Sequence, residues 1–174
     1  MRNIILFGLP RSGKSYFSRH LAKKIGKEAI ETDTLLEQLY TQKKGKTLPC
    51  SAIYRKIGET PFRELEKEVV SSLQCNGKIL SLGGGTILCP ENQKTLAKIG
   101  SLVYLVVEKE IWKQQMHKSP LPTYLDSTHL DESLENLYQK RLSQYEKIPA
   151  TPLLQTGKTD EEIITTLEKL YYGK

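Results

Sequence analysis

The sequence predicts an α/β fold, with a central parallel sheet of about five strands in a three-layer α/β/α arrangement. Short apolar runs that suit buried parallel strands recur along the chain. Segments with an apolar residue every three or four positions, typical of amphipathic helices, separate those runs. The 174 residues suffice for one substantial core and are too few for two ordinary domains. We therefore expect a single domain over residues 1–174.

The strand-like and helix-like segments alternate along the chain. The expected strands cover residues 3–7, 28–33, 79–82, 101–107 and 151–156. The expected helices cover residues 16–25, 34–42, 51–57, 61–75, 91–99, 109–117, 131–147 and 159–172. In the first helix Phe17, Leu21 and Ile25 recur every fourth residue, and Gly26 is a suitable C-terminal stop. This alternation favours a mostly parallel sheet.

Composition narrows the class of protein. Charged residues make up 26% of the chain and hydrophobic residues 38%, which is typical of a folded domain. No apolar run approaches the length of about 18 residues that a membrane helix needs, and we see no signal peptide, so we expect a cytoplasmic protein. The net charge of +6 suits the binding of anionic small molecules. Three widely spaced cysteines, at positions 50, 75 and 89, indicate reduced thiols without a metal.

A phosphate-binding loop is the clearest motif. Residues 8–15, Gly-Leu-Pro-Arg-Ser-Gly-Lys-Ser, match G-x-x-x-x-G-K-[ST] between an expected strand and an expected helix. Glycines let the backbone turn its N–H groups toward phosphate oxygens, and the following helix directs its N-terminus at the same anion. Lys14 would reach the β- and γ-phosphates, and the Ser15 hydroxyl would bind Mg²⁺. We expect ATP to bind at Pro10, Arg11, Ser12, Gly13, Lys14 and Ser15.

Two carboxylates follow the second expected strand. Phosphoryl transfer needs a carboxylate that holds Mg²⁺ through water or orients the attacking hydroxyl. Glu31 and Asp33 lie two residues apart, so they share one face if the strand persists that far. The carboxyl ends of parallel strands bind ligands, which favours a role in the site. For Asp33 the alternative is a helix N-cap, and which acid faces the metal stays open.

At this point the chain resembles the shikimate kinase family, related to the nucleoside monophosphate kinases. Besides the phosphate loop, the resemblance rests on Glu31-Thr32-Asp33, on Phe62-Arg63-Glu64-Leu65-Glu66, and on Gly83-Gly84-Gly85 after the third strand. A weaker match runs from Arg141 to Tyr145. Together these features cover roughly residues 3–145, and their combination is far more specific than the phosphate loop alone.

The resemblance implies roles for the matched residues. Asp33 would bind substrate hydroxyls and act as, or assist, the base at the 3-hydroxyl of shikimate. Arg63 and Arg141 would clamp the substrate carboxylate, which suits a planar guanidinium. Gly84 and Gly85 would offer backbone N–H groups, in a substrate-binding region that includes residues 34–66. Alternatively, Arg63 pairs with Glu59 or Glu66, the glycines form only a turn, and Arg141 is solvated.

The chain departs from the family pattern in three places. Glu31 stands where the family usually has Asp, and it remains our candidate for the metal side together with Ser15. In the expected lid, residues 113–128, Ser119 replaces the arginine of Arg-Pro-Leu-Leu, so Lys118 is the nearest cation and our catalytic candidate there. The stretch from Arg141 to Tyr145 lacks the family's proline.

The sequence thus predicts a monomeric P-loop kinase that transfers the γ-phosphate of ATP to shikimate, with Mg²⁺ as cofactor. A sister kinase that acts on gluconate or a nucleotide is the first alternative. A P-loop switch or a nucleic-acid-binding ATPase is the second, and the scattered lysines do not favour a nucleic-acid partner.

Overall fold

The computed structural model describes residues 2–118, 122, 125 and 128–173. Its centre is a five-stranded sheet in the order β2-β3-β1-β4-β5, in which every pair of neighbours is parallel. The strands are β1 (Asn3–Phe7), β2 (Ala29–Glu31), β3 (Ile79–Ser81), β4 (Gly100–Val106) and β5 (Thr151–Leu154). The predicted α/β class and strand number are confirmed.

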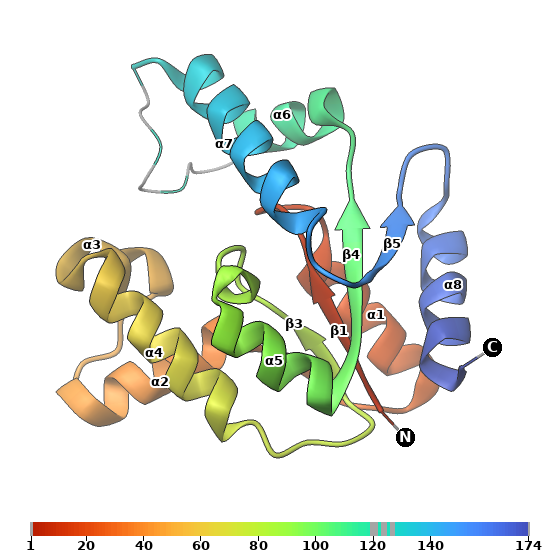
Figure 1. Ribbon diagram of the computed structural model, residues 1–174, viewed down its shortest axis with the longest axis horizontal. Coiled ribbons are helices and arrows are strands. Elements are labelled where there is room, and N and C mark those ends of the chain that lie inside the picture. Colours follow the sequence, from red (N-terminus) through yellow and green to blue (C-terminus); the bar gives the residue numbers. More distant parts are fainter. Residues whose placement is uncertain (1, 119–121, 123–124, 126–127, 174) are drawn as a thin grey trace.

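Helices cover both faces of the sheet, because the central strands are apolar on both sides. Ile4 and Leu6 of β1 face the helices α1 (Lys14–Ile25) and α8 (Asp160–Tyr172), and these residues form one core cluster. Ile5 and Phe7 face the opposite cluster. The helices on that side are α5 (Pro90–Ile99), α6 (Lys109–His117) and α7 (Leu130–Tyr145). Figure 1 shows the three layers and places α6 and α7 beyond the carboxyl ends of the strands.

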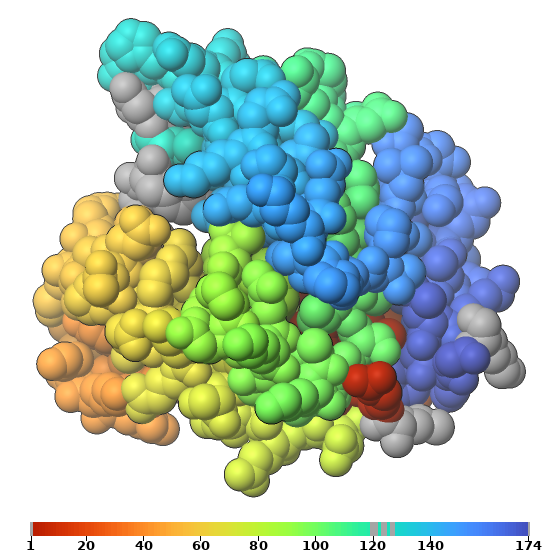
Figure 2. Space-filling view, viewed as in Figure 1, coloured from red at the N-terminus to blue at the C-terminus, as the bar shows by residue number. Residues whose placement is uncertain are grey.

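A third, smaller core lies beside the sheet. It joins α2 (Thr32–Lys44), α3 (Cys50–Ile57) and α4 (Glu59–Ser72) through five buried side chains: Leu36, Tyr40, Ile53, Phe62 and Val69. In the space-filling view these helices form a lobe, orange to yellow, separate from α7 in cyan and blue (Figure 2). The fold therefore presents a site between this lobe and the carboxyl edge of the sheet.

The second strand is shorter than the sequence predicts. Glu31 ends β2 and Thr32 begins α2, so Glu31 and Asp33 are not alternate residues of one strand. The ladder stops because β3 itself is only three residues long. The Thr32 hydroxyl then accepts from the N–H of Gly83 at 3.0 Å, which takes the place of the next ladder bond.

Helix ends also differ slightly from the predicted ones. Helix α4 begins at Glu59 and ends at Ser72, with Pro61 in its first turn as expected. The N-cap of α2 is Glu31, so the N-cap alternative for Asp33 is wrong. Within the described residues, no helix is both long and apolar enough to cross a membrane. In the same part of the chain Cys50, Cys75 and Cys89 are free thiols.

Candidate active site

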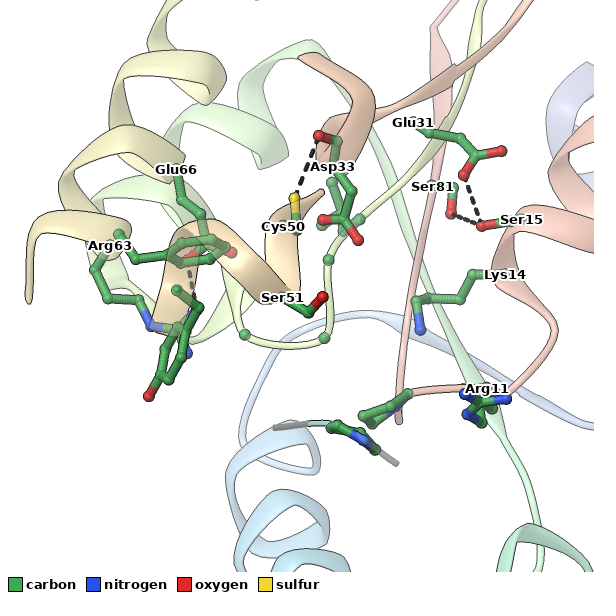
Figure 3. Close-up of a pocket in the computed structure, with 18 of the residues that line it drawn as sticks. Arg11, Lys14, Ser15, Glu31, Asp33, Cys50, Ser51, Arg63, Glu66 and Ser81 are labelled. Atoms are coloured by element: carbon green, nitrogen blue, oxygen red, sulfur yellow. Dashed lines mark hydrogen bonds and ion pairs between the residues drawn. The ribbon is translucent and has the colours of Figure 1, made fainter. Parts of the chain in front are cut away.

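A cavity of about 310 Å³ opens at the carboxyl ends of β1, β2 and β3. The phosphate loop forms one wall, the glycine turn after β3 forms the floor, and α2, α3 and α4 form the far wall (Figure 3). Most of the predicted site residues line it: Pro10, Arg11, Lys14, Ser15, Glu31, Asp33, Arg63, Gly84, Gly85 and Arg141. The fold thus brings together residues that lie more than 130 positions apart in the sequence.

The phosphate loop has the backbone shape that its glycines allow. Gly8 and Gly13 have φ of 151° and 85°, which side chains disfavour. A Cβ on Gly8 would lie 2.7 Å from the carbonyl oxygen of Leu105 on the neighbouring strand. The loop runs directly into α1, whose first residue is Lys14. The backbone N–H groups at that helix start can therefore face an anion.

Lys14 is the central positive charge of the cavity. Its side chain is buried, and Nζ donates to the carbonyl oxygens of Leu9 at 2.7 Å and Gly8 at 3.2 Å. Burial lowers its pKa to about 8, partly offset by the attraction of Asp33, while Arg141 lowers it further. The lysine is held where an anionic ligand would restore its full charge.

Asp33 faces the cavity from the first turn of α2, on the opposite side from Lys14 (Figure 3). Burial of the carboxyl raises its pKa to about 6 even though Lys14 opposes the shift, and Glu66, Glu37 and Glu31 raise it further. A Cβ on Gly83 would lie 2.5 Å from Oδ1 of Asp33. The first glycine of the turn is therefore required so that this carboxyl can occupy its place.

Three oxygen-bearing side chains gather beside the phosphate loop. The Ser15 hydroxyl donates to Oε2 of Glu31 at 3.0 Å and lies 3.3 Å from Oγ of Ser81. The other carboxylate oxygen of Glu31 pairs with Arg19 at 2.9 Å. Hard oxygen donors of this kind suit Mg²⁺, which keeps several waters and takes only one or two protein ligands. No cluster of three acidic, histidine or cysteine ligands occurs among the described residues, so such an ion would rely on phosphate oxygens.

Arg63 enters the cavity from α4 and is tied to the glycine turn through Glu66. Its Nη1 pairs with Oε2 of Glu66 at 2.5 Å, and Oε1 of that acid accepts from the Thr86 hydroxyl at 2.6 Å. Glu66 is only 5% exposed. A Cβ on Gly85 would lie 2.3 Å from the guanidinium, so this glycine makes room for Arg63. The pairing with Glu66 that the sequence suggested as an alternative is present, and Arg63 also lines the cavity.

Helix α7 supplies Arg141 and Tyr145 to the same turn. Nη1 of Arg141 donates to the carbonyl oxygen of Gly84 at 3.2 Å. The Tyr145 hydroxyl donates to that oxygen at 2.5 Å and lies 3.2 Å from the carbonyl oxygen of Gly8. Tyr145 is buried and contacts the Phe7 ring edge-on. It therefore joins the glycine turn to the start of the phosphate loop.

The expected lid is only partly described. Lys118 follows α6 as its C-cap, is exposed, and does not line the cavity. Ser119 lies outside the described residues, whereas Pro122 lines the cavity. Lys113, a second lysine in the expected lid segment, pairs with Glu135 of α7 at 2.8 Å.

Sequence reasoning gave no role to several residues of this site. Glu66 lies inside the quoted F-R-x-x-E motif and Tyr145 ends the quoted R-x-x-x-Y, so both signals were present. Cys50, Ser51 and Tyr54 of α3 line the cavity without a recognisable motif. Burial raises the pKa of the Cys50 thiol, and nearby Asp33 and Glu37 add to this, so the thiol stays protonated.

The fold and the cavity define a class of protein. A phosphate loop ahead of a helix, a carboxyl beside it and two arginines across a small cavity suit phosphoryl transfer to a small acceptor. The chain is a small-molecule P-loop kinase.

Comparison with known proteins narrows the class. The family model described as shikimate kinase matches residues 10–171. A shikimate kinase of Clostridium botulinum is 35% identical over 167 residues, covering 95% of this chain and 94% of the relative. One of Thermodesulfovibrio yellowstonii is 29% identical over 178 residues, covering 100% and 99%. The chain therefore belongs to the shikimate kinase family.

Solved structures with a similar fold include a shikimate kinase. Shikimate kinase from Acinetobacter baumannii in complex with shikimate has a TM-score of 0.83 and 25% identity, covering 99% of this chain and 94% of that chain. A gluconokinase from Sinorhizobium meliloti has a TM-score of 0.50 at 18% identity, covering 99% and 97%, which shows a shared fold alone. The fold by itself therefore does not separate these acceptors.

Proposed function

We propose that this chain transfers the γ-phosphate of ATP to the 3-hydroxyl of shikimate. The observation that carries the proposal is that the cavity brings the charge of Lys14 and the carboxyl of Asp33 together with two guanidinium groups, those of Arg63 and Arg141. A monocarboxylate with several hydroxyls fits a cavity that offers both a carboxyl group and two guanidinium groups. Its carboxylate would pair with the two guanidinium groups, and its reacting hydroxyl would lie between Asp33 and the phosphate loop.

In this proposal each residue type has one task. Asp33 accepts the proton of the attacking hydroxyl, and Lys14 neutralises charge on the phosphoryl group. The N–H groups of Gly84 and Gly85 hold substrate oxygens. Pro10, Arg11, Ser12, Gly13 and Ser15 complete the nucleotide site.

A magnesium ion fits beside Ser15. The Ser15 hydroxyl would ligate it directly, and Glu31, already within 3.0 Å of that hydroxyl, would hold a metal-bound water. The ion would supply charge neutralisation for the phosphates. This arrangement favours Glu31 rather than Asp33 as the metal-side carboxylate.

An acceptor screen tests the function. ADP release from ATP is followed in a coupled assay with shikimate, gluconate or a nucleoside monophosphate as acceptor. We expect turnover with shikimate as acceptor and none with gluconate or a nucleoside monophosphate. Arg63→Ala should raise the KM for shikimate at least tenfold and leave the KM for ATP within about twofold, since a charge-assisted pair is lost only on the acceptor side. Faster turnover with gluconate would overturn the proposal.

Four further sequence predictions complete the proposal. The enzyme acts as a monomer in the cytoplasm, has no nucleic-acid partner, and closes residues 113–128 over the nucleotide. Sedimentation, cell fractionation and a nucleic-acid binding assay at low salt would check the first three points.

A further inference from the structure

The phosphate loop contains one strained residue. Arg11 has φ of 60°, and it is the only non-glycine residue with positive φ among those the structure describes. Side chains disfavour this conformation, and it persists where the surroundings fix it more than once. Arg11 therefore needs support from outside the loop.

Two side chains from distant elements contact the backbone on either side of Arg11. The indole N–H of Trp112, on α6, donates to the carbonyl oxygen of Pro10 at 2.8 Å. The side-chain amide of Gln155, just after β5, donates to the carbonyl oxygen of Ser12 at 2.9 Å. One bond precedes the strained residue and the other follows it.

Each of these bonds fixes the direction of a backbone N–H group. In a planar trans peptide the carbonyl and the following N–H point in opposite directions. Trp112 therefore sets the N–H of Arg11, and Gln155 sets the N–H of Gly13. Each N–H group is therefore turned away from the side chain that binds its peptide, which leaves both N–H groups available to an anion.

Packing and strand pairing hold both donor residues in place. Trp112 is fully buried in the larger core cluster, together with Met116 and Leu134, and its ring lies 5.6 Å from that of Tyr138. The backbone N–H of Gln155 donates to the carbonyl oxygen of Val106 at 3.1 Å, which extends the β4–β5 pairing by one residue. Neither donor can follow the loop if Arg11 relaxes.

We propose that Trp112 and Gln155 are positioning residues that clamp the two peptides around Arg11 and so hold the phosphate loop in its nucleotide-binding shape. The proposal rests on the phosphate loop being the nucleotide site, as in the proposed function.

Nucleotide binding by single variants is the first test. The Kd of Mg-ADP is measured by calorimetry for wild type, Trp112→Phe and Gln155→Leu, without acceptor. Phe keeps an aromatic ring in the core and removes the donor, so we expect 5- to 30-fold weaker binding, the range set by the cost of a left-handed residue. Tyr138→Phe is the matched control, because its hydroxyl contacts Val107 rather than the loop, and it should bind ADP like wild type.

A second test separates the clamp from general support of the core. Glycine adopts positive φ freely, so in an Arg11→Gly background the loop needs less clamping. We expect Trp112→Phe and Gln155→Leu to weaken ADP binding by less than half the factor seen with Arg11 present. Gln155→Leu, at a half-buried position, keeps the test available if Trp112→Phe does not fold.

The binding measurements distinguish a failure of the clamp proposal from a failure of the proposed function. If wild type binds ADP and both variants bind it within twofold of wild type, the clamp is refuted and the proposed function stands. An equal loss in both backgrounds also refutes it, because strain at Arg11 is then irrelevant. If wild type binds no Mg-ADP, the proposed function fails and this inference fails with it.

Discussion

At the scale of single residues, Lys14 carries a charge that the proposed function needs, in a buried position that disfavours the charged form. Lys14→Met should lower kcat at least about 100-fold, since one transition-state charge contact is lost. Burial lowers the Lys14 pKa from 10.5 to about 8, so the native state binds this proton less tightly than the unfolded chain. The charged lysine therefore costs stability below pH 8, and the cost is relieved as the pH rises from 8 toward 10.5.

The same variant thus carries a stability prediction. Lys14→Met should raise the free energy of unfolding at pH 7, by at most roughly 3 kcal/mol, and this gain should shrink at pH 9.5. Urea unfolding at the two pH values measures it. A variant that turns over at more than a tenth of the wild-type rate, or is less stable at pH 7, would contradict the assignment.

The proposed role of Asp33 as the base predicts a pH dependence of the reaction. Burial raises the pKa of this carboxyl to about 6, and a base must be deprotonated to accept the proton of the hydroxyl. We expect kcat/KM for shikimate to be level above pH 7 and to fall about tenfold per pH unit below 6. In Asp33→Asn the rate should be low at every pH, and the fall in kcat/KM below pH 6 should be absent. If this fall is unchanged in the variant, it belongs to the titration of another group.

At the scale of elements, Glu66 joins α4 to the glycine turn. Glu66→Gln removes the charge that holds Arg63 and weakens the bond to Thr86, and a buried charged partner of this kind is worth about 1.5–3 kcal/mol. We expect the KM for shikimate to rise about 10- to 100-fold and the KM for ATP to stay within twofold. Glu64→Gln is the control, since Glu64 pairs with Lys67 on the outer side of α4. Equal effects of the two variants would remove the special role of Glu66.

The end of α6 tests the lid. In the described structure Lys118 is exposed and outside the cavity, so it contributes only if residues 113–128 close over ATP. Lys118→Met should then lower kcat by about 10- to 1000-fold. Lys169→Met, an exposed lysine in the last turn of α8, is the control and should turn over normally. Normal turnover of Lys118→Met would leave Arg11 and Lys113 as the next cations to examine.

At the scale of the whole molecule, the lobe of α2, α3 and α4 has a core of its own. Ile53 is fully buried there, and Ile53→Ala should cost about 2–4 kcal/mol. Because α3 and α4 line the acceptor side, the KM for shikimate should rise more than the KM for ATP. Leu167→Ala, in the core cluster that α1 and α8 form with the sheet, should lower the free energy of unfolding by a similar amount. It should not raise the KM for shikimate more than the KM for ATP. Equal KM ratios would mean that the lobe is not a separate substrate-binding unit.

The local patterns of this sequence determined much of the molecule. The apolar runs of β1 and β4 and the periodicity of α1 predicted a parallel sheet flanked by helices, because buried strands and amphipathic helices leave direct compositional signals. The phosphate loop was readable because its glycines and Lys14 are required at a fixed spacing. The family resemblance predicted that Arg63, Arg141 and the glycine turn belong to the site, and all three line the cavity.

Tertiary structure alone decided how these parts meet. The end of β2 depends on the length of β3, which no local pattern encodes. The glycine turn must stay free of side chains because Asp33 and Arg63 occupy the space that Cβ atoms would need. The pairing of Trp112 with Pro10 spans 102 residues. Such contacts arise from packing between distant elements, so a single sequence determines which residues are available and the folded chain determines what they touch.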